Sequence, residues 1–414
     1  MKLDFYNINE RICGYSMAVT FFCILISTAV INVGILLSVL TGLILITKEK
    51  KYLEVFIKNK INLTILLLML TFIFSYSYSI ASFEEAIASL KKYIRLLFIP
   101  ICYYILKIDW IRDKAINYFI AGCTIIMFLS YLKYFHIIEP ISFEKFANFL
   151  GLDYQYKLLS GVTITQHSII HGLVLSFYFI ITYLKANKTS SILYYLLSFL
   201  SFYNVLFMNL SRTSFIIISI LIMLIIFSYC KNKNYKKTFI AFVILSLILI
   251  IGNKTIMYER YNNAINDLTS IKNNSYNTSL GLRYVYAENG IENIKLKPIF
   301  GHGIGSYKNT IKNYFSKNNL ELEFCCLTQN PHNEFISIST QTGLFGLFIY
   351  LSFIFFLIKD LHSTQIGKSV IAIIIVSSFF NSIFYDNVIC IFSVLMISLA
   401  MQKMPGFNIK QNKY

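Results

Sequence analysis

Apolar runs of about 20 residues recur from one end of this chain to the other. This recurrence limits the possible folds more than any other feature, because a helix needs about 20 apolar residues to cross the roughly 30 Å hydrocarbon core of a bilayer. Of the 414 residues, 56% are hydrophobic and only 14% are charged, whereas soluble domains carry about 25% charge. The sequence therefore predicts an all-α polytopic membrane protein.

About twelve transmembrane helices are predicted from these runs. They cover residues 13–29, 31–47, 61–79, 94–106, 115–134, 164–184, 191–210, 213–230, 238–252, 335–358, 368–384 and 387–402. This number of spans places both termini on one side of the membrane. The short loops on that side are rich in lysine, as at Lys48, Lys50, Lys51, Lys231 and Lys233. By the positive-inside rule we expect both termini in the cytoplasm.

The net charge of +17 has the same explanation. Most of the excess lies in the predicted cytoplasmic loops and tails, so it indicates topology and gives no reason to expect a nucleic-acid partner. Membrane lipids are the expected surroundings.

Three regions follow from the pattern: residues 1–252 with spans one to nine, a large loop at 253–334, and residues 335–414 with spans ten to twelve and a cytoplasmic tail. The loop falls on the periplasmic side and has helical spacing in TSLGLRYVYAENGIENI and again in KNTIKNYFSKNNLELEF. Thr278 or Ser279 is a plausible helix cap, and Pro298 with nearby glycines marks a stop and a turn. A loop of this length and patterning is expected to form a helical periplasmic cap.

Arg212 and Arg283 are the first candidates for chemistry. Arg212 stands in NLSRTSF at the predicted outer end of span seven, and Arg283 in the first helix of the cap. A guanidinium group forms planar, bidentate hydrogen bonds with phosphate oxygens. The plainer alternatives are snorkelling of Arg212 to the interface and, for Arg283, an exposed helix surface paired with Glu288 or Asp267.

His332 is the candidate base. It stands in QNPHNEF directly before span ten, so its imidazole is expected near a helix amino terminus, which favours an anion. A histidine titrates near pH 6.5, which suits it to take a proton from a sugar hydroxyl. A structural cap histidine is the alternative.

Four further residues are candidate substrate contacts: Lys91, Arg95, His302 and Asn333. Lys91 and Arg95 lie on successive turns leading into span four, where interfacial anchoring is the alternative. His302 stands in the glycine-rich GHGIGSY, where a purely structural turn is the alternative, and Asn333 follows His332.

The sequence gives no reason to expect a metal or cofactor. It contains no Walker motif, and the predicted outer loops have no Asp-x-Asp pair of the kind that holds a metal and a nucleotide sugar. His167 and His171 are one turn apart but lack a third ligand, so core packing or cavity lining is expected for them. Cys325 and Cys326 are adjacent, and whether they are oxidised stays open. A sugar already activated on a lipid pyrophosphate would need none of these groups.

The chain resembles the O-antigen ligases of the Wzy-C superfamily, which includes polymerases and protein oligosaccharyltransferases. The resemblance extends over the whole chain and is most specific in RYNNAINDL, in TSLGLRYVYAENGIENIKLKP and in PHNEFISISTQTGLFGL. The family's essential arginines match Arg212 and Arg283, and its essential histidine matches His332.

The resemblance implies a GT-C type, inverting, metal-independent glycosyltransferase of lipopolysaccharide biosynthesis. It would transfer O-antigen polysaccharide from undecaprenyl pyrophosphate to lipid A–core in the periplasm. Two alternatives stay open: an O-antigen polymerase with the same chemistry, and a polysaccharide or lipid transporter. A transporter usually needs polar residues in mid-span, whereas several spans here are apolar throughout. The oligomeric state, the donor sugars and the acceptor sugar are not predicted.

Overall fold

The computed structural model describes residues 2–47, 56, 58–137, 163–164, 166–230, 254–273, 276, 278–318 and 330–402. All structural statements below refer to these residues. The predicted span at 238–252 and the Cys325–Cys326 pair lie outside them.

Helices make up nearly all of the described chain. The larger ones are α1 (Lys2–Phe22), α2 (Thr28–Ile46), α4 (Lys60–Tyr76), α5 (Phe83–Tyr93), α6 (Phe98–Ile105), α7 (Asp109–Tyr134), α9 (Ser168–Thr189), α10 (Ile192–Tyr203), α11 (Arg212–Cys230), α13 (Lys254–Lys272), α14 (Ser279–Leu296), α15 (Tyr307–Lys317), α16 (Glu334–Leu361), α17 (Gln365–Phe380) and α18 (Asn387–Ala400). Short turns of 3-10 helix, η1 (Cys23–Leu25) and η2 (Ile94–Leu97), and one π-helical turn, η4 (Asn204–Met208), join some of them.

The predicted all-α polytopic membrane class agrees with these elements. Helices α2, α7, α9 and α16 are long and apolar enough to cross a bilayer, and α4, α10, α11, α17 and α18 are shorter apolar helices. Each predicted span within the described ranges corresponds to helical chain. The predicted tenth span, 335–358, lies wholly within the longest helix, α16, and begins one residue later than the helix.

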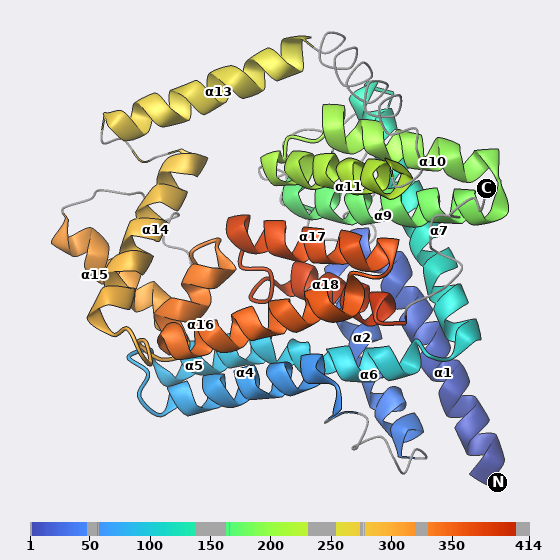
Figure 1. Ribbon diagram of the computed structural model, residues 1–414, viewed down its shortest axis with the longest axis horizontal. Helices are drawn as coiled ribbons and strands as arrows, with labels where there is room; N and C mark the ends of the chain where they lie inside the picture. The colour runs from blue at the N-terminus through green and yellow to red at the C-terminus, as the bar shows by residue number, and fades with distance from the viewer. Residues whose placement is uncertain are drawn as a thin grey trace.

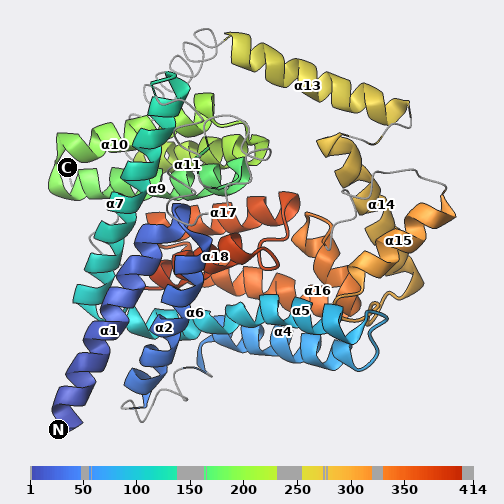
Figure 2. The same cartoon turned by 180° about the vertical axis from the view of Figure 1, so that it is seen from behind.

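Helices α16, α17 and α18 form the centre of the bundle (Figure 1). Helices α4, α5 and α6 run along one side of this centre, and α9, α10 and α11 cover the other (Figure 2). Contacts of α16 with α4 and α17, and of α17 with α11, hold the layers together. The main hydrophobic core lies among these helices and includes Phe119, Phe177 and Phe392, whose rings contact one another.

Between α11 and α16, the described residues form three helices, α13, α14 and α15. Thr278 caps α14 by accepting a hydrogen bond from the Gly281 amide at 3.1 Å. Helices α14 and α15 share a small core of their own, formed by Val285, Tyr286, Tyr307, Ile311 and Phe315. Helix α13 was not predicted as a separate element. It packs on α14, and its ribbon stands apart from the bundle in both views (Figures 1 and 2).

The turn after α14 docks into a kink in α16. At Gly343 the backbone of α16 adopts φ 67° and ψ −166°, which only glycine adopts readily. This opens the helix, so that the amides of Leu344 and Phe345 donate to the carbonyls of Pro298 and Ile299. A Cβ atom at position 343 would lie 2.1 Å from the Ile299 carbonyl oxygen. The glycine-rich GHGIGSY segment therefore joins the cap to the central helix.

Candidate functional site

Arg212 is the first residue of α11, and the segment before it is tightly ordered. The side-chain amide nitrogen of Asn209, Nδ2, donates to the Ser168 carbonyl at 3.0 Å. The side-chain oxygen of Asn209 accepts from the backbone amide of Ser211, also at 3.0 Å. Gly172 of α9 lies so close that a Cβ there would be 2.2 Å from the Asn209 side chain. The π-helical turn η4 directly precedes this loop, and such turns are frequent at functional sites.

The guanidinium of Arg212 forms an ion pair with Asp267 of α13. The distance between Arg212 Nη1 and Asp267 Oδ2 is 3.0 Å, and the arginine side chain is 44% exposed. This ion pair joins the beginning of α11 to α13, whose ribbon stands apart from the bundle (Figures 1 and 2). Neither of the two plainer alternatives, snorkelling for Arg212 or an Arg283–Asp267 pair, predicted this contact.

Arg283 lies on α14 with its side chain half-buried. Burial, and then the like charge of Arg212, lower the pKa of its guanidinium. Among the described residues it has no acidic partner, because Asp267 pairs with Arg212 and Glu288 accepts hydrogen bonds from Tyr284 and Tyr314. A partly desolvated, uncompensated cation of this kind is stabilised by an anionic ligand.

His332 lies two residues before α16 and close to Arg283. Its backbone adopts a φ of 50°, and its amide donates to Asn330 Oδ1 at 2.9 Å. The centroid of its ring is 6.2 Å from that of Tyr286 on α14. Burial, the charge of Arg283 and the neighbouring His167 lower the pKa of His332 to about 4. The imidazole is therefore neutral at pH 7 and able to accept a proton.

Arg212, Arg283 and His332 thus form one electrostatic group. Arg212 acts on the pKa of Arg283, and Arg283 acts on the pKa of His332. The three residues come from α11, from α14 and from the chain before α16. The structure brings together the three residues that the sequence singled out as catalytic candidates.

His167 and Asp386 also belong to this group, and the sequence reasoning did not assign them to it. Burial and the charge of Arg283 lower the pKa of His167, whereas the charge of Asp386 raises it. His167 caps α9 rather than lying on it, whereas His171 is fully buried and contacts Asn204 at 3.2 Å. The two histidines, one turn apart, therefore have different surroundings. Asp386 caps α18 by accepting from the Ile389 amide.

Lys92, at the end of α5, and Arg95, in η2, extend the group. Lys92 Nζ lies 3.7 Å from the ring centroid of Tyr385. Burial and the charge of Arg95 lower the pKa of Lys92, whereas the charge of Asp386 raises it. Arg95 Nη1 is buried and has no hydrogen-bond partner in the described part of the chain. Lys91, which is a predicted substrate contact, is exposed. The helical register turns Lys92, not Lys91, towards the neighbouring helices.

Glu334, the first residue of α16, is fully buried. Its Oε2 accepts a hydrogen bond from the Phe384 amide at 3.0 Å, which ties the turn between α17 and α18 to the beginning of α16. Its Oε1 has no partner within the described ranges. The sequence reasoning missed this residue, although an acidic side chain at the start of an apolar span is itself a signal, because such groups are rarely buried without function.

Asn333 and His302 have structural partners. The Asn333 side chain caps α16 by accepting from the Ile336 amide and donates to the Phe379 carbonyl, both at 3.0 Å. His302 is buried in the turn after α14, and its Nε2 contacts the Asn293 carbonyl at 3.0 Å. The alternative of a structural turn at GHGIGSY fits the His302 contact. The cap of α16 is Asn333 and not His332, which was the residue named in the alternative of a cap histidine.

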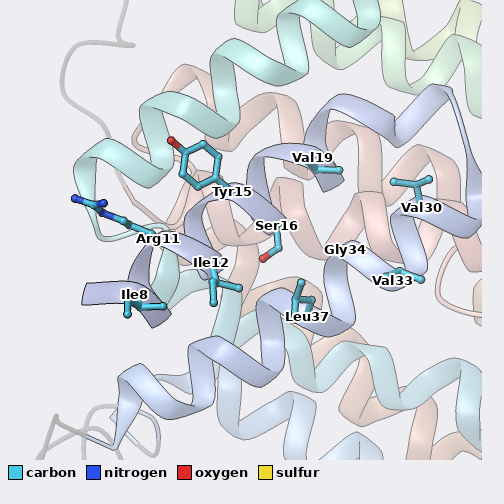
Figure 3. A pocket seen from close by; sticks show the side chains of 10 residues that line it. All are labelled: Ile8, Arg11, Ile12, Tyr15, Ser16, Val19, Val30, Val33, Gly34 and Leu37. Carbon is cyan, nitrogen blue, oxygen red and sulfur yellow. The ribbon is translucent and has the colours of Figure 1, made fainter. Parts of the chain in front are cut away.

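The described residues offer no group of three His, Cys, Asp or Glu side chains arranged to hold a metal ion. A groove of about 480 Å³ lies elsewhere, between α1 and α2 (Figure 3). Apart from Arg11 and Ser16, its walls are largely apolar side chains such as Ile12, Val19, Val33 and Leu37. None of the residues discussed above lines this groove.

Residues 196–351 match the family model described as O-antigen ligase. An uncharacterized protein of Haemophilus influenzae is 31% identical over 188 residues, which cover 42% of this chain and 46% of that protein. An O-antigen ligase of Escherichia coli is 33% identical over 158 residues, which cover 37% of each chain. The chain therefore spans less than half the length of the curated relatives it matches. The family match contains Arg212, Arg283 and His332.

Proposed function

We propose that this chain, which carries an O-antigen ligase family domain at residues 196–351, is an O-antigen ligase. In this proposal it transfers O-antigen polysaccharide from undecaprenyl pyrophosphate to a sugar of lipid A–core. The transfer takes place at the periplasmic face of a Gram-negative inner membrane, with both termini in the cytoplasm. The described helices and the family match support a membrane-bound glycosyl-transferring enzyme.

The observation that carries the proposal is the electrostatic coupling of a neutral imidazole to two guanidinium groups. Burial keeps His332 unprotonated, and Arg283 has no acidic partner in the described chain. Such a group fits a reaction in which an anion leaves while a hydroxyl loses its proton. The chemistry needs no metal, because the sugar is already activated by its pyrophosphate.

In the proposed reaction His332 takes the proton from an acceptor hydroxyl as its oxygen attacks the anomeric carbon. A new carbon–oxygen bond forms, and the bond from the anomeric carbon to the pyrophosphate oxygen breaks. The leaving pyrophosphate takes the bonding electron pair, and Arg212 and Arg283 stabilise the charge that develops on it. Attack from the face opposite the leaving group inverts the anomeric centre.

Arg212 must exchange partners in this scheme. Asp267 pairs with its guanidinium in the structure, so the pyrophosphate replaces a carboxylate with a more highly charged group. The bidentate geometry of arginine suits both partners. Lys92 and Arg95 are proposed to contact the acceptor, since Asp386 acts on the pKa of both Lys92 and His167, and Arg95 acts on that of Lys92.

A deletion strain examined by lipopolysaccharide gel tests the proposal. Loss of a ligase leaves bare core, and long polymer stays on the undecaprenyl carrier. Loss of a polymerase instead leaves core with a single repeat unit. Complementation with the unchanged chain should restore the ladder, and an unaltered ladder in the deletion strain would reject both activities.

A further inference from the structure

Helix α13 has an apolar face that nothing in the described chain covers. Tyr258, Tyr261, Ile265 and Leu268 are 66%, 63%, 41% and 54% exposed. Their spacing of three, four and three residues places them on one side of the helix. Four large side chains exposed in one stripe are more than the scattered apolar residues of an ordinary surface.

The opposite side of α13 is fixed to the bundle. Asp267 points away from the stripe, because at 100° per residue it lies well over 90° from the mean direction of the four apolar positions. Its carboxylate pairs with Arg212, the first residue of the apolar helix α11. The ion pair therefore holds α13 beside the first residue of an apolar helix.

We propose that α13 lies along the lipid–water interface with this stripe inserted among the lipids of the bilayer. Three observations support lipid as the occupant: the attachment to the end of α11, the two tyrosines, and the exposed Lys272 in the last turn. Tyrosine has an apolar ring and a polar hydroxyl and is enriched at membrane interfaces. A lysine at that level can reach anionic headgroups. The proposal does not depend on glycosyl transfer.

The docking also has a consequence for the site. Helices that bind in the plane of a membrane bury their apolar face about 5–10 Å into the boundary between headgroups and acyl chains. Lipid binding would hold the helix that carries Asp267 in place, so that its position relative to Arg212 does not rest on one partly exposed ion pair alone.

Tryptophan fluorescence tests the proposal, because the chain contains a single tryptophan, Trp110. In a Trp110→Phe background, Tyr261→Trp and Leu268→Trp place the probe on the stripe, and Ser270→Trp places it on the side of Asp267. The full-length variants are reconstituted in vesicles of phosphatidylethanolamine and phosphatidylglycerol, with and without bromine on the acyl chains. If the Trp110→Phe chain does not accumulate, Trp110 is kept and its own emission is subtracted.

Brominated lipid should quench both stripe tryptophans severalfold more than the tryptophan at position 270. Equal quenching at all three positions would contradict the proposal. A blue-shifted stripe emission that bromine leaves unchanged would also contradict it, because protein, such as a second copy of the chain, would then cover the face. Activity is measured separately, so a loss of transfer without a change in quenching bears only on the enzymatic proposal.

Discussion

The imidazole of His332 is kept neutral by burial and by nearby positive charge. An ordinary histidine is partly protonated near pH 6.5, whereas burial and Arg283 lower the pKa of His332 to about 4. The lowered pKa makes His332 a weaker base. When the anionic donor binds, it neutralises the guanidinium charge of Arg283 and so restores part of the basicity of His332.

The pH dependence of transfer follows from this shift. The active form of the base is neutral, so kcat/KM should stay level from pH 7 down to about 5 and fall as His332 is protonated near pH 4. The profile of kcat, which reports the donor complex, should show its acid limb at a higher pH, because bound pyrophosphate removes part of the repulsion. An acid limb of kcat/KM at 6.5 would mean that His332 is not the base or is not buried in the free enzyme.

Replacing Asp267 should strengthen donor binding. Asp267→Asn removes the carboxylate that pairs with Arg212 and frees the guanidinium for phosphate. Exposed ion pairs contribute about 0–1 kcal/mol, so the donor KM should fall by up to about fivefold. The matched control is Asn266→Ala, which changes the exposed neighbouring residue of the same helix. A raised KM for Asp267→Asn would show that the carboxylate positions Arg212 rather than competing for it.

Glu334 offers a test that separates its hydrogen bond from its charge. Glu334→Ala leaves the buried Phe384 amide without its acceptor, which costs about 1–3 kcal/mol. Glu334→Gln keeps an oxygen for that bond. We expect a lower midpoint of thermal unfolding for the alanine variant than for the glutamine variant. Equal loss in both would mean that the charge of Glu334, through a group not yet assigned, supports the fold.

Among the helices, the kink of α16 connects the cap to the bundle. The GHGIGSY turn occupies the opening at Gly343, and its neighbour α14 carries Arg283. The position of Arg283 relative to His332 therefore depends on a backbone junction as well as on side chains.

Gly343→Ala should disrupt this junction. The substitution forces a Cβ into the Ile299 carbonyl and requires a φ of 67° from alanine, at a cost of about 1–3 kcal/mol or more. We expect a strong reduction of folded protein in the membrane, measured by detergent extraction and size-exclusion chromatography. Gly34→Ala is the comparison, because its nearest contact there is the Thr20 side chain. Equal accumulation of the two variants would argue against a strained junction.

The sequence predicted the helices well because long apolar runs and helix caps are local signals. Thr278 and the start of α16 at Glu334 are examples. The pairing of Arg212 with Asp267 and the inward direction of Lys92 were not predictable, because both depend on how distant helices pack. Spacing grouped His167 with His171, but the helix begins between them, at Ser168, and separates their environments.

For the whole molecule, the candidate site lies at one end of a bundle whose centre is built from three helices. Helices α16, α17 and α18 provide that centre (Figure 1), and the site residues come from the ends of helices around it and from the cap. A site at one end of the bundle suits the proposed reaction between two lipid-linked substrates in the same leaflet.

The most direct measurement is transfer by the purified chain in vesicles that contain the lipid-linked polysaccharide donor and lipid A–core. The unchanged chain should form the linked product without added metal or nucleotide. His332→Ala, Arg283→Ala and Arg212→Ala should each lose transfer by several orders of magnitude while remaining folded. The control is His362→Ala, which changes an exposed histidine at the other end of α16 and should keep full activity. Transfer by His332→Ala or Arg283→Ala at the rate of the control would contradict the proposed site.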